Sequence, residues 1–221
     1  MRSELLLVRH GEVEGARTAK RVSGAENPPL SEKGRVSATQ IAWRLASEKD
    51  ITALCTSPLL RAKETADIIG ARLNLKPQVV DALREWDFRR EMGLGDRLLL
   101  LLVTTLSHLA PFRRLLWYQW ARSPALQAYV RSVADAAGQI MAAHPGRRIV
   151  IVAHGGAIDA LLTHYFPEPK QWERGVIRNC SLTRLEVGPG GARLLAFNDC
   201  DHLQPVSWPV HLVAAVPKEP M

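Results

Sequence analysis

Two histidines in this sequence stand in the same local setting. His10 follows the apolar run "LLLVR" and precedes Gly11, and His154 follows "IVIVA" and precedes Gly155. A short apolar run that ends on polar residues is typical of a buried strand, and its carboxyl end brings those residues to the edge of a sheet. The repeated setting favours a shared ligand over two unrelated core histidines.

Two arginines and a carboxylate accompany the histidines. Arg9 directly precedes His10, Arg61 lies within about one turn of a predicted helix start, and Glu85 ends the extended segment "QVVDALRE". A helix N-terminus has free N–H groups and positive dipole charge, so it suits an anion. Each residue alone is an ordinary surface or core residue. Arginines and histidines around one point suit a phosphoryl group.

Other chemistries fit the sequence less well. A zinc site needs closely spaced ligands or more carboxylates, and Arg9 would repel a cation. A serine or cysteine nucleophile has no elbow motif here. We therefore expect neither a metal nor a cofactor.

The chain alternates between predicted strands and helices. Ser31 and the pairs Ser57-Pro58 and Ser123-Pro124 are typical helix starts. This alternation predicts a three-layer α/β/α fold with a mostly parallel central sheet. The predicted strands are "LLLV" near the start, "ITALCTS", "RRIVIVAH", and the late pair "SLTRLEV" and "ARLLAFN".

Residues 89–123 do not follow this alternation. The run "LLLLLV" at 98–103 is too short to cross a bilayer. The segment "RRLLWYQWAR" at 113–122 mixes bases with aromatic residues, which leaves open contact with a membrane surface or a partner. We favour a core-facing amphipathic helix, and the apolar insert also leaves a homodimer surface open.

The composition limits the class of protein. The chain has 221 residues, of which 47% are hydrophobic, and this suits one domain with an elaborated insert. The net charge of +7 allows nucleic-acid binding, but the arginines are scattered and no nucleic-acid motif is present. Three cysteines without disulfide or metal spacing, and no visible signal peptide, predict a cytoplasmic protein.

Several motifs in order along the chain resemble those of one known family. These are "LLLVRHGE", "TSPLLRAKETA", "LREWDF", "IVIVAHGG" and "FNDCDHL". Together they resemble the histidine phosphatase superfamily, which has the phosphoglycerate-mutase-like fold. The resemblance covers most of 4–88 and 124–203 and fades over 89–123, so it implies a single domain, 1–221, with a variable helical insert there.

The resemblance implies a role for each residue of the predicted centre. His10 is the nucleophile that forms a phosphohistidine, and Glu85 donates a proton to the leaving oxygen. Arg9, Arg61 and His154 bind the phosphoryl oxygens, with help from backbone N–H groups near Gly155. Arg21, which we prefer over Arg17 in the alignment, corresponds to a further phosphate-binding arginine. The implied substrate is a small phosphate ester.

The sequence also departs from the family pattern. Ala16 stands where an asparagine is common, and Arg89 replaces a glycine in the loop after Glu85. The E-R-H-Y-G stretch of the glycolytic mutases is absent, which favours a phosphatase. A mutase-type phosphotransferase, and a binding or scaffold protein with weak catalysis, remain the alternatives.

Overall fold

A central sheet organises the chain in the computed structural model. The structure describes residues 1–15, 27–87, 93, 95, 98, 123–167 and 176–203. Six described strands lie in the order β3-β2-β4-β1-β5-β6. Those that run parallel are β1 (Ser3–Arg9), β2 (Ile51–Thr56), β3 (Gln78–Val79) and β4 (Arg148–Ala153); β5 (Leu182–Gly188) and β6 (Gly191–Asp199) are antiparallel.

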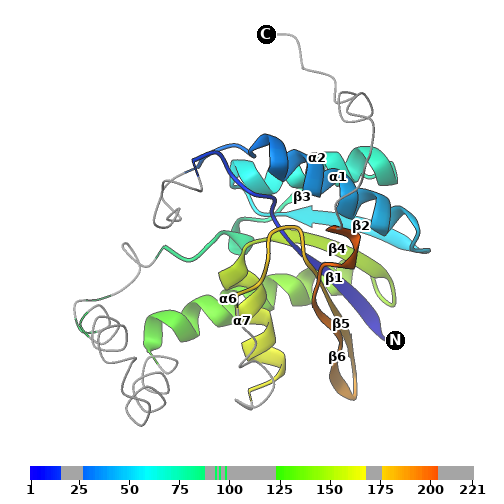
Figure 1. The fold of residues 1–221 in the computed structure, drawn as a ribbon. Helices are drawn as coiled ribbons and strands as arrows, with labels where there is room; N and C mark the ends of the chain where they lie inside the picture. Colours follow the sequence, from blue (N-terminus) through cyan, green and yellow to red (C-terminus); the bar gives the residue numbers. More distant parts are fainter. Residues whose placement is uncertain are drawn as a thin grey trace.

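Helices cover both faces of this sheet, which confirms the predicted fold class. On one face lie α1 (Glu32–Ala46) and α2 (Leu60–Leu73), and on the other α6 (Pro124–Ala143) and α7 (Gly155–Tyr165) (Figure 1). Short 3-10 helices follow β3 and β6, at Asp81–Leu83 and Asp201–Leu203.

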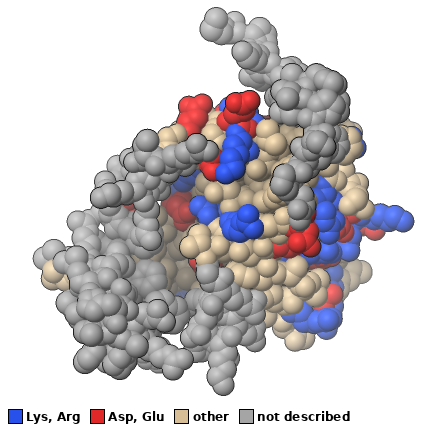
Figure 2. Space-filling model, viewed as in Figure 1, with Lys and Arg blue, Asp and Glu red and all other residues tan. Residues whose placement is uncertain are grey.

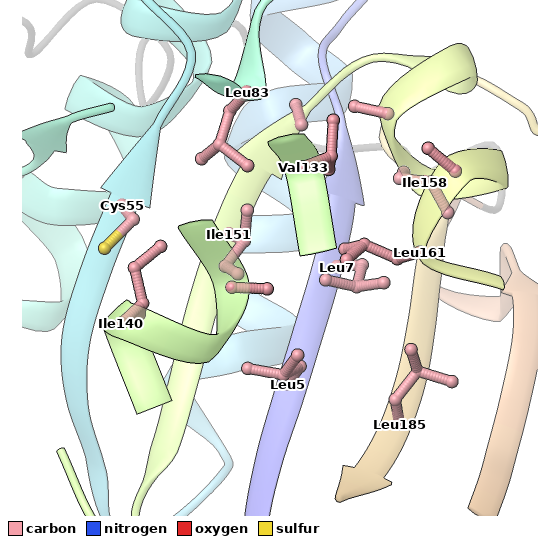
Figure 3. Close-up of a cluster of buried hydrophobic side chains, with 14 of the residues drawn as sticks. Leu5, Leu7, Cys55, Leu83, Val133, Ile140, Ile151, Ile158, Leu161 and Leu185 are labelled. Carbon is pink, nitrogen blue, oxygen red and sulfur yellow. The ribbon is translucent and has the colours of Figure 1, made fainter. Parts of the chain in front are cut away.

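The apolar runs of the strands are buried on both sides. Leu5 and Leu7 of β1 face α6 and α7, where they pack with Ile151, Val133 and Leu161 (Figure 3). The alternate residues Leu6 and Val8 instead join the core under α1 and α2. Continuous apolar runs are therefore needed here, because a parallel sheet covered on both faces has no solvent side.

The predicted helix starts agree with the structure at two of three places. Ser31 and Ser123 accept hydrogen bonds from the backbone N–H groups of Gly34 and Leu126, as capping residues do. The prediction for Ser57-Pro58 was wrong, because α2 begins at Leu60 with Leu59 as its cap. Ser57 is engaged elsewhere, since its hydroxyl bonds to His154.

The charge distribution matches the scattered arginines of the sequence. Figure 2 shows basic and acidic residues interspersed over the described part of one face. Within the described residues, no helix is long and apolar enough to span a membrane. Most of the predicted insert, 89–123, and with it the segment 113–122, lies outside the described residues.

Candidate active site

The two histidines meet because their strands are neighbours in the sheet. β1 and β4 pair in parallel, with Arg9 opposite Ala153, so the next residues, His10 and His154, leave the sheet side by side. Their ring centroids are 5.0 Å apart and both side chains are buried. The site thus forms at the carboxyl edge of the two central parallel strands, where open α/β sheets bind ligands.

The ring of His10 is fixed in one tautomer by the backbone. Its Nδ1 lies 2.7 Å from the carbonyl oxygen of Gly11, which can only accept a hydrogen bond. Nδ1 therefore carries the proton, and the lone pair of Nε2 is left for chemistry. This lone pair accepts a hydrogen bond from Nε of Arg61, at 3.2 Å.

Arg61 is positioned by the first turn of α2. Its side chain is buried, with 2% of its surface exposed. A buried guanidinium is retained only where anions or polar groups satisfy its charge. Burial lowers the pKa of Arg61, while the negative charge of Glu85 raises it. The arginine therefore faces both the histidine pair and the carboxylate.

His154 is held by Ser57, at the end of β2. The hydroxyl of Ser57 lies 2.7 Å from Nε2 of His154 and accepts a bond from the N–H of Leu59. The Ser57 hydroxyl donates its proton to Nε2 of His154, because the described part of the chain offers this proton no other acceptor. His154 then carries its proton on Nδ1, a buried atom with no hydrogen-bond partner among the described residues. Such a donor suits a ligand oxygen.

Glu85 reaches the site from the loop after β3. Its Oε1 accepts a hydrogen bond from the backbone N–H of Gly156, at 3.2 Å, in the first turn of α7. The loop is anchored on α6, because Trp86 stacks on Tyr129 and the Tyr129 hydroxyl donates to the carbonyl of Arg84 at 2.9 Å. The carboxylate is therefore fixed from two sides.

Arg9 lies beside this cluster. One terminal nitrogen of its guanidinium donates to the carbonyl oxygen of Ile177, whereas its buried Nε has no partner in the described ranges. A Cβ built on Gly155 would lie 3.9 Å from that Nε, so this glycine also borders the site. Arg21 and its alternative Arg17 fall outside the described residues.

Burial and mutual charge shift the titration of the site. Burial lowers the pKa of both His10 and His154 well below the ordinary histidine range, and neighbouring positive charges lower it further. Burial raises the pKa of Glu85, an effect that Arg61 and Arg9 partly offset. The site therefore combines neutral imidazoles with a carboxyl group that keeps its proton more readily than usual.

Three further residues that the sequence reasoning did not assign support the site. The side chain of Asn179 donates to the carbonyl of His10 at 2.8 Å, and Thr65 accepts from the N–H of Gly11 at 3.1 Å. Thr65 lies one helical turn after Arg61 and within "RAKETA", so the helical period could have identified it. Ser57 lies in the same motif, "TSPLLRAKETA", but its bond to His154, like the role of Asn179, depends on tertiary contacts.

The layered fold and this cluster define a class: α/β proteins with a histidine–arginine centre at the edge of a parallel sheet. The family model of the histidine phosphatase superfamily (branch 1) matches residues 5–200. The chain belongs to this superfamily, and this confirms the resemblance of its motifs.

Named relatives include phosphatases and mutases. A probable phosphoglycerate mutase GpmB from Cronobacter sakazakii is 32% identical over 190 residues, which cover 83% of this chain and 84% of the relative. A metal-independent phosphoserine phosphatase from Arabidopsis thaliana is 26% identical over 227 residues, which cover 93% of this chain and 85% of the relative. A solved mycobacterial glucosyl-3-phosphoglycerate phosphatase superposes with a TM-score of 0.69 at 26% identity, over 90% of this chain and all of that one.

Proposed function

We propose that this protein is a metal-independent phosphomonoester hydrolase that works through a phosphohistidine on His10. The observation that carries the proposal is the tautomer of His10: Nδ1 is held by the carbonyl of Gly11, and Nε2 faces Arg61. A neutral ring whose unprotonated nitrogen lies beside two arginines is what attack on a phosphoryl group requires. The family match over 5–200 supports a single domain with the insert at about 89–123.

The first step transfers the phosphoryl group to the histidine. Nε2 of His10 attacks phosphorus and the bond from phosphorus to the ester oxygen breaks. The leaving oxygen takes the proton of the Glu85 carboxyl group. Arg61, Arg9 and the Nδ1–H of His154 donate to the phosphoryl oxygens, and preorganised donors of this kind stabilise the charge of the transition state. Arg61 exchanges its bond to Nε2 for one to a phosphoryl oxygen.

The second step returns the enzyme to its starting state. Glu85, now a carboxylate, takes a proton from water while the water oxygen attacks phosphorus. The bond between phosphorus and Nε2 breaks, inorganic phosphate forms, and His10 is again neutral. The low pKa of His10 favours this release, because the free ring is stable without a proton.

Phosphate release in the presence of a chelator tests the proposal. The purified protein should hydrolyse p-nitrophenyl phosphate at equal rates with and without EDTA, because the proposed roles use only side chains and backbone. A loss of activity in EDTA that Mg²⁺ or Zn²⁺ restores would contradict metal independence. An absence of turnover with p-nitrophenyl phosphate and with a panel of metabolite monoesters would contradict the hydrolase itself.

A mutase-type phosphotransferase is the second candidate, favoured by the relatives named as probable phosphoglycerate mutases. Both reactions pass through a phosphohistidine, and they differ in whether water or a retained hydroxyl accepts the phosphoryl group. Incubation with 3-phosphoglycerate and 2,3-bisphosphoglycerate separates them. We expect inorganic phosphate as the main product, whereas rapid formation of 2-phosphoglycerate would support the mutase.

Gly156→Ala should lower kcat by about a hundredfold, because displacement of a catalytic group by about 1 Å can cost that much. A Cβ at this position would overlap Oε1 of Glu85 and push the carboxylate away. Gly155→Ala is the matched control, since its Cβ would make only an ordinary contact with Arg9. Steady-state kinetics on both variants, with circular dichroism for the fold, make the comparison. Equal effects of the two substitutions would contradict this placement of Glu85.

Ser57→Ala should lower kcat/KM by about tenfold, the order expected for one lost hydrogen bond. Without the hydroxyl, His154 is no longer held as the Nδ1–H tautomer that donates to the phosphoryl group. Ser57→Thr keeps a hydroxyl and should retain most of the activity. Nitrogen-15 NMR of His154 reports the tautomer directly. An unchanged tautomer and unchanged kinetics in Ser57→Ala would remove Ser57 from the mechanism.

A further inference from the structure

A carboxylate that the mechanism does not use lies on the face of α7 that borders the site. A Cβ on Gly155 would point at Arg9, and a Cβ on Gly156 would meet Glu85. Asp159 follows these positions by four and three residues, so it lies on the same face one turn further on. Side chains on a helix lean toward its N-terminus, which brings this carboxylate back toward the site.

The charges around Asp159 agree with this placement. Burial and the charge of Glu85 raise the pKa of Asp159 to about 6, and the charge of Arg9 lowers it. Neighbouring groups thus partly desolvate the carboxylate although the residue keeps an exposed surface, and the carboxylate makes no ion pair or hydrogen bond with the described residues. At neutral pH Asp159 is therefore mostly ionised, and it lies close enough to Glu85 and Arg9 to interact with both charges.

We propose that Asp159 makes the enzyme prefer phosphate esters whose alcohol carries an ammonium group over esters whose alcohol carries a carboxylate. The proposal rests on the function given above. Glu85 protonates the leaving oxygen, so the rest of the alcohol lies beyond Glu85 and near Asp159. An ammonium group there is attracted and a carboxylate is repelled. Arg9 and Arg61 are engaged by the phosphoryl group and do not reverse this preference.

Two small substrates isolate the effect of charge. Phosphoethanolamine and 2-phosphoglycolate are two-carbon phosphate esters that differ mainly in an ammonium group against a carboxylate. The ratio of their kcat/KM values is measured at neutral pH for the wild-type protein and Asp159→Asn, with p-nitrophenyl phosphate as the reference substrate. Asp135→Asn on α6 removes the same charge from an exposed residue that does not act on Arg9, Glu85 or Asp159, and serves as the control.

The wild-type ratio should favour phosphoethanolamine, and Asp159→Asn should reduce it by about fivefold, the order expected for a solvent-exposed charge pair. Asp135→Asn should leave it unchanged. A wild-type ratio that favours 2-phosphoglycolate, an Asp159→Asn ratio equal to wild type, or hydrolysis of p-nitrophenyl phosphate alone would overturn the proposal.

A binding measurement tests the charge preference of Asp159 independently of whether the protein hydrolyses phosphate esters. Calorimetry with the two esters on His10→Ala, with and without Asp159→Asn, reports the charge preference without turnover. Tighter binding of phosphoethanolamine that is lost with Asp159→Asn supports the role of Asp159 even if wild-type hydrolysis is absent. Equal binding of both esters, or no binding of either, contradicts it.

Discussion

His10→Ala should lower phosphate release from p-nitrophenyl phosphate by at least about a thousandfold, as expected when the nucleophile of a covalent mechanism is removed. No other described side chain offers a neutral nitrogen lone pair held by the backbone beside two arginines. Continuous phosphate-release assays measure the loss. His10→Ala still has Arg9, Arg61 and His154, whose side chains stabilise the charge of a phosphoryl group. The variant should therefore still bind phosphate.

The control for this variant is His164→Ala. His164 lies on the exposed side of α7 and takes no part in the site, so its loss should leave turnover near the wild-type value. Circular dichroism and thermal unfolding establish that both variants are folded. Comparable activity in His10→Ala and wild type would refute His10 as the nucleophile.

Glu85→Gln should separate the two chemical steps. Glutamine cannot supply a proton to the leaving oxygen. For esters with poor leaving groups, kcat should therefore fall by about a hundredfold to ten-thousandfold, the range for general acid–base catalysis. The nitrophenolate group leaves without protonation, so the first step with p-nitrophenyl phosphate should persist. Hydrolysis of the phosphohistidine needs the base and should slow. We therefore expect a burst of nitrophenolate in stopped-flow measurements, followed by slow turnover.

The pH profile tests the same residue. For esters with poor leaving groups, catalysis requires neutral His10 and protonated Glu85, so kcat/KM should fall below the lowered pKa of His10 and above the raised pKa of Glu85. The activity optimum is thus expected on the acid side, and the fall at higher pH should be absent from Glu85→Gln. Glu85 would not be the general acid if kcat/KM fell at high pH with the same midpoint in wild type and in Glu85→Gln. A linear time course without a burst in Glu85→Gln would contradict its role as well.

The histidine pair could be predicted because it depends on local patterns. Each apolar run identifies a buried strand, and parallel strands end at the same edge of a sheet. The sequence does not specify that β1 and β4 are neighbours, yet this pairing sets the two rings 5.0 Å apart. The resemblance to the family motifs was needed to predict that His10 and His154 belong to one site.

The supporting contacts could not be predicted in the same way. Ser57 and Pro58 have the local pattern of a helix start, but the bond to His154 is made across neighbouring strands and has no signature in the chain. The dependence of Glu85 on Gly156 is likewise a contact between residues far apart in sequence. Local sequence patterns predict the helices and strands. Contacts between polar groups such as Ser57 and His154 depend on how those helices and strands pack in three dimensions.

Direct detection of phosphate on His10 tests the central claim. Wild-type protein and Glu85→Gln are mixed with p-nitrophenyl phosphate and quenched in alkaline detergent, because the phosphorus–nitrogen bond of phosphohistidine is labile in acid. Peptide mass spectrometry then locates the phosphoryl group. We expect one phosphoryl group on His10, more abundant in Glu85→Gln and absent from His10→Ala. Phosphate release by a protein that carries no phosphoryl group, or carries it on another residue, would contradict the mechanism.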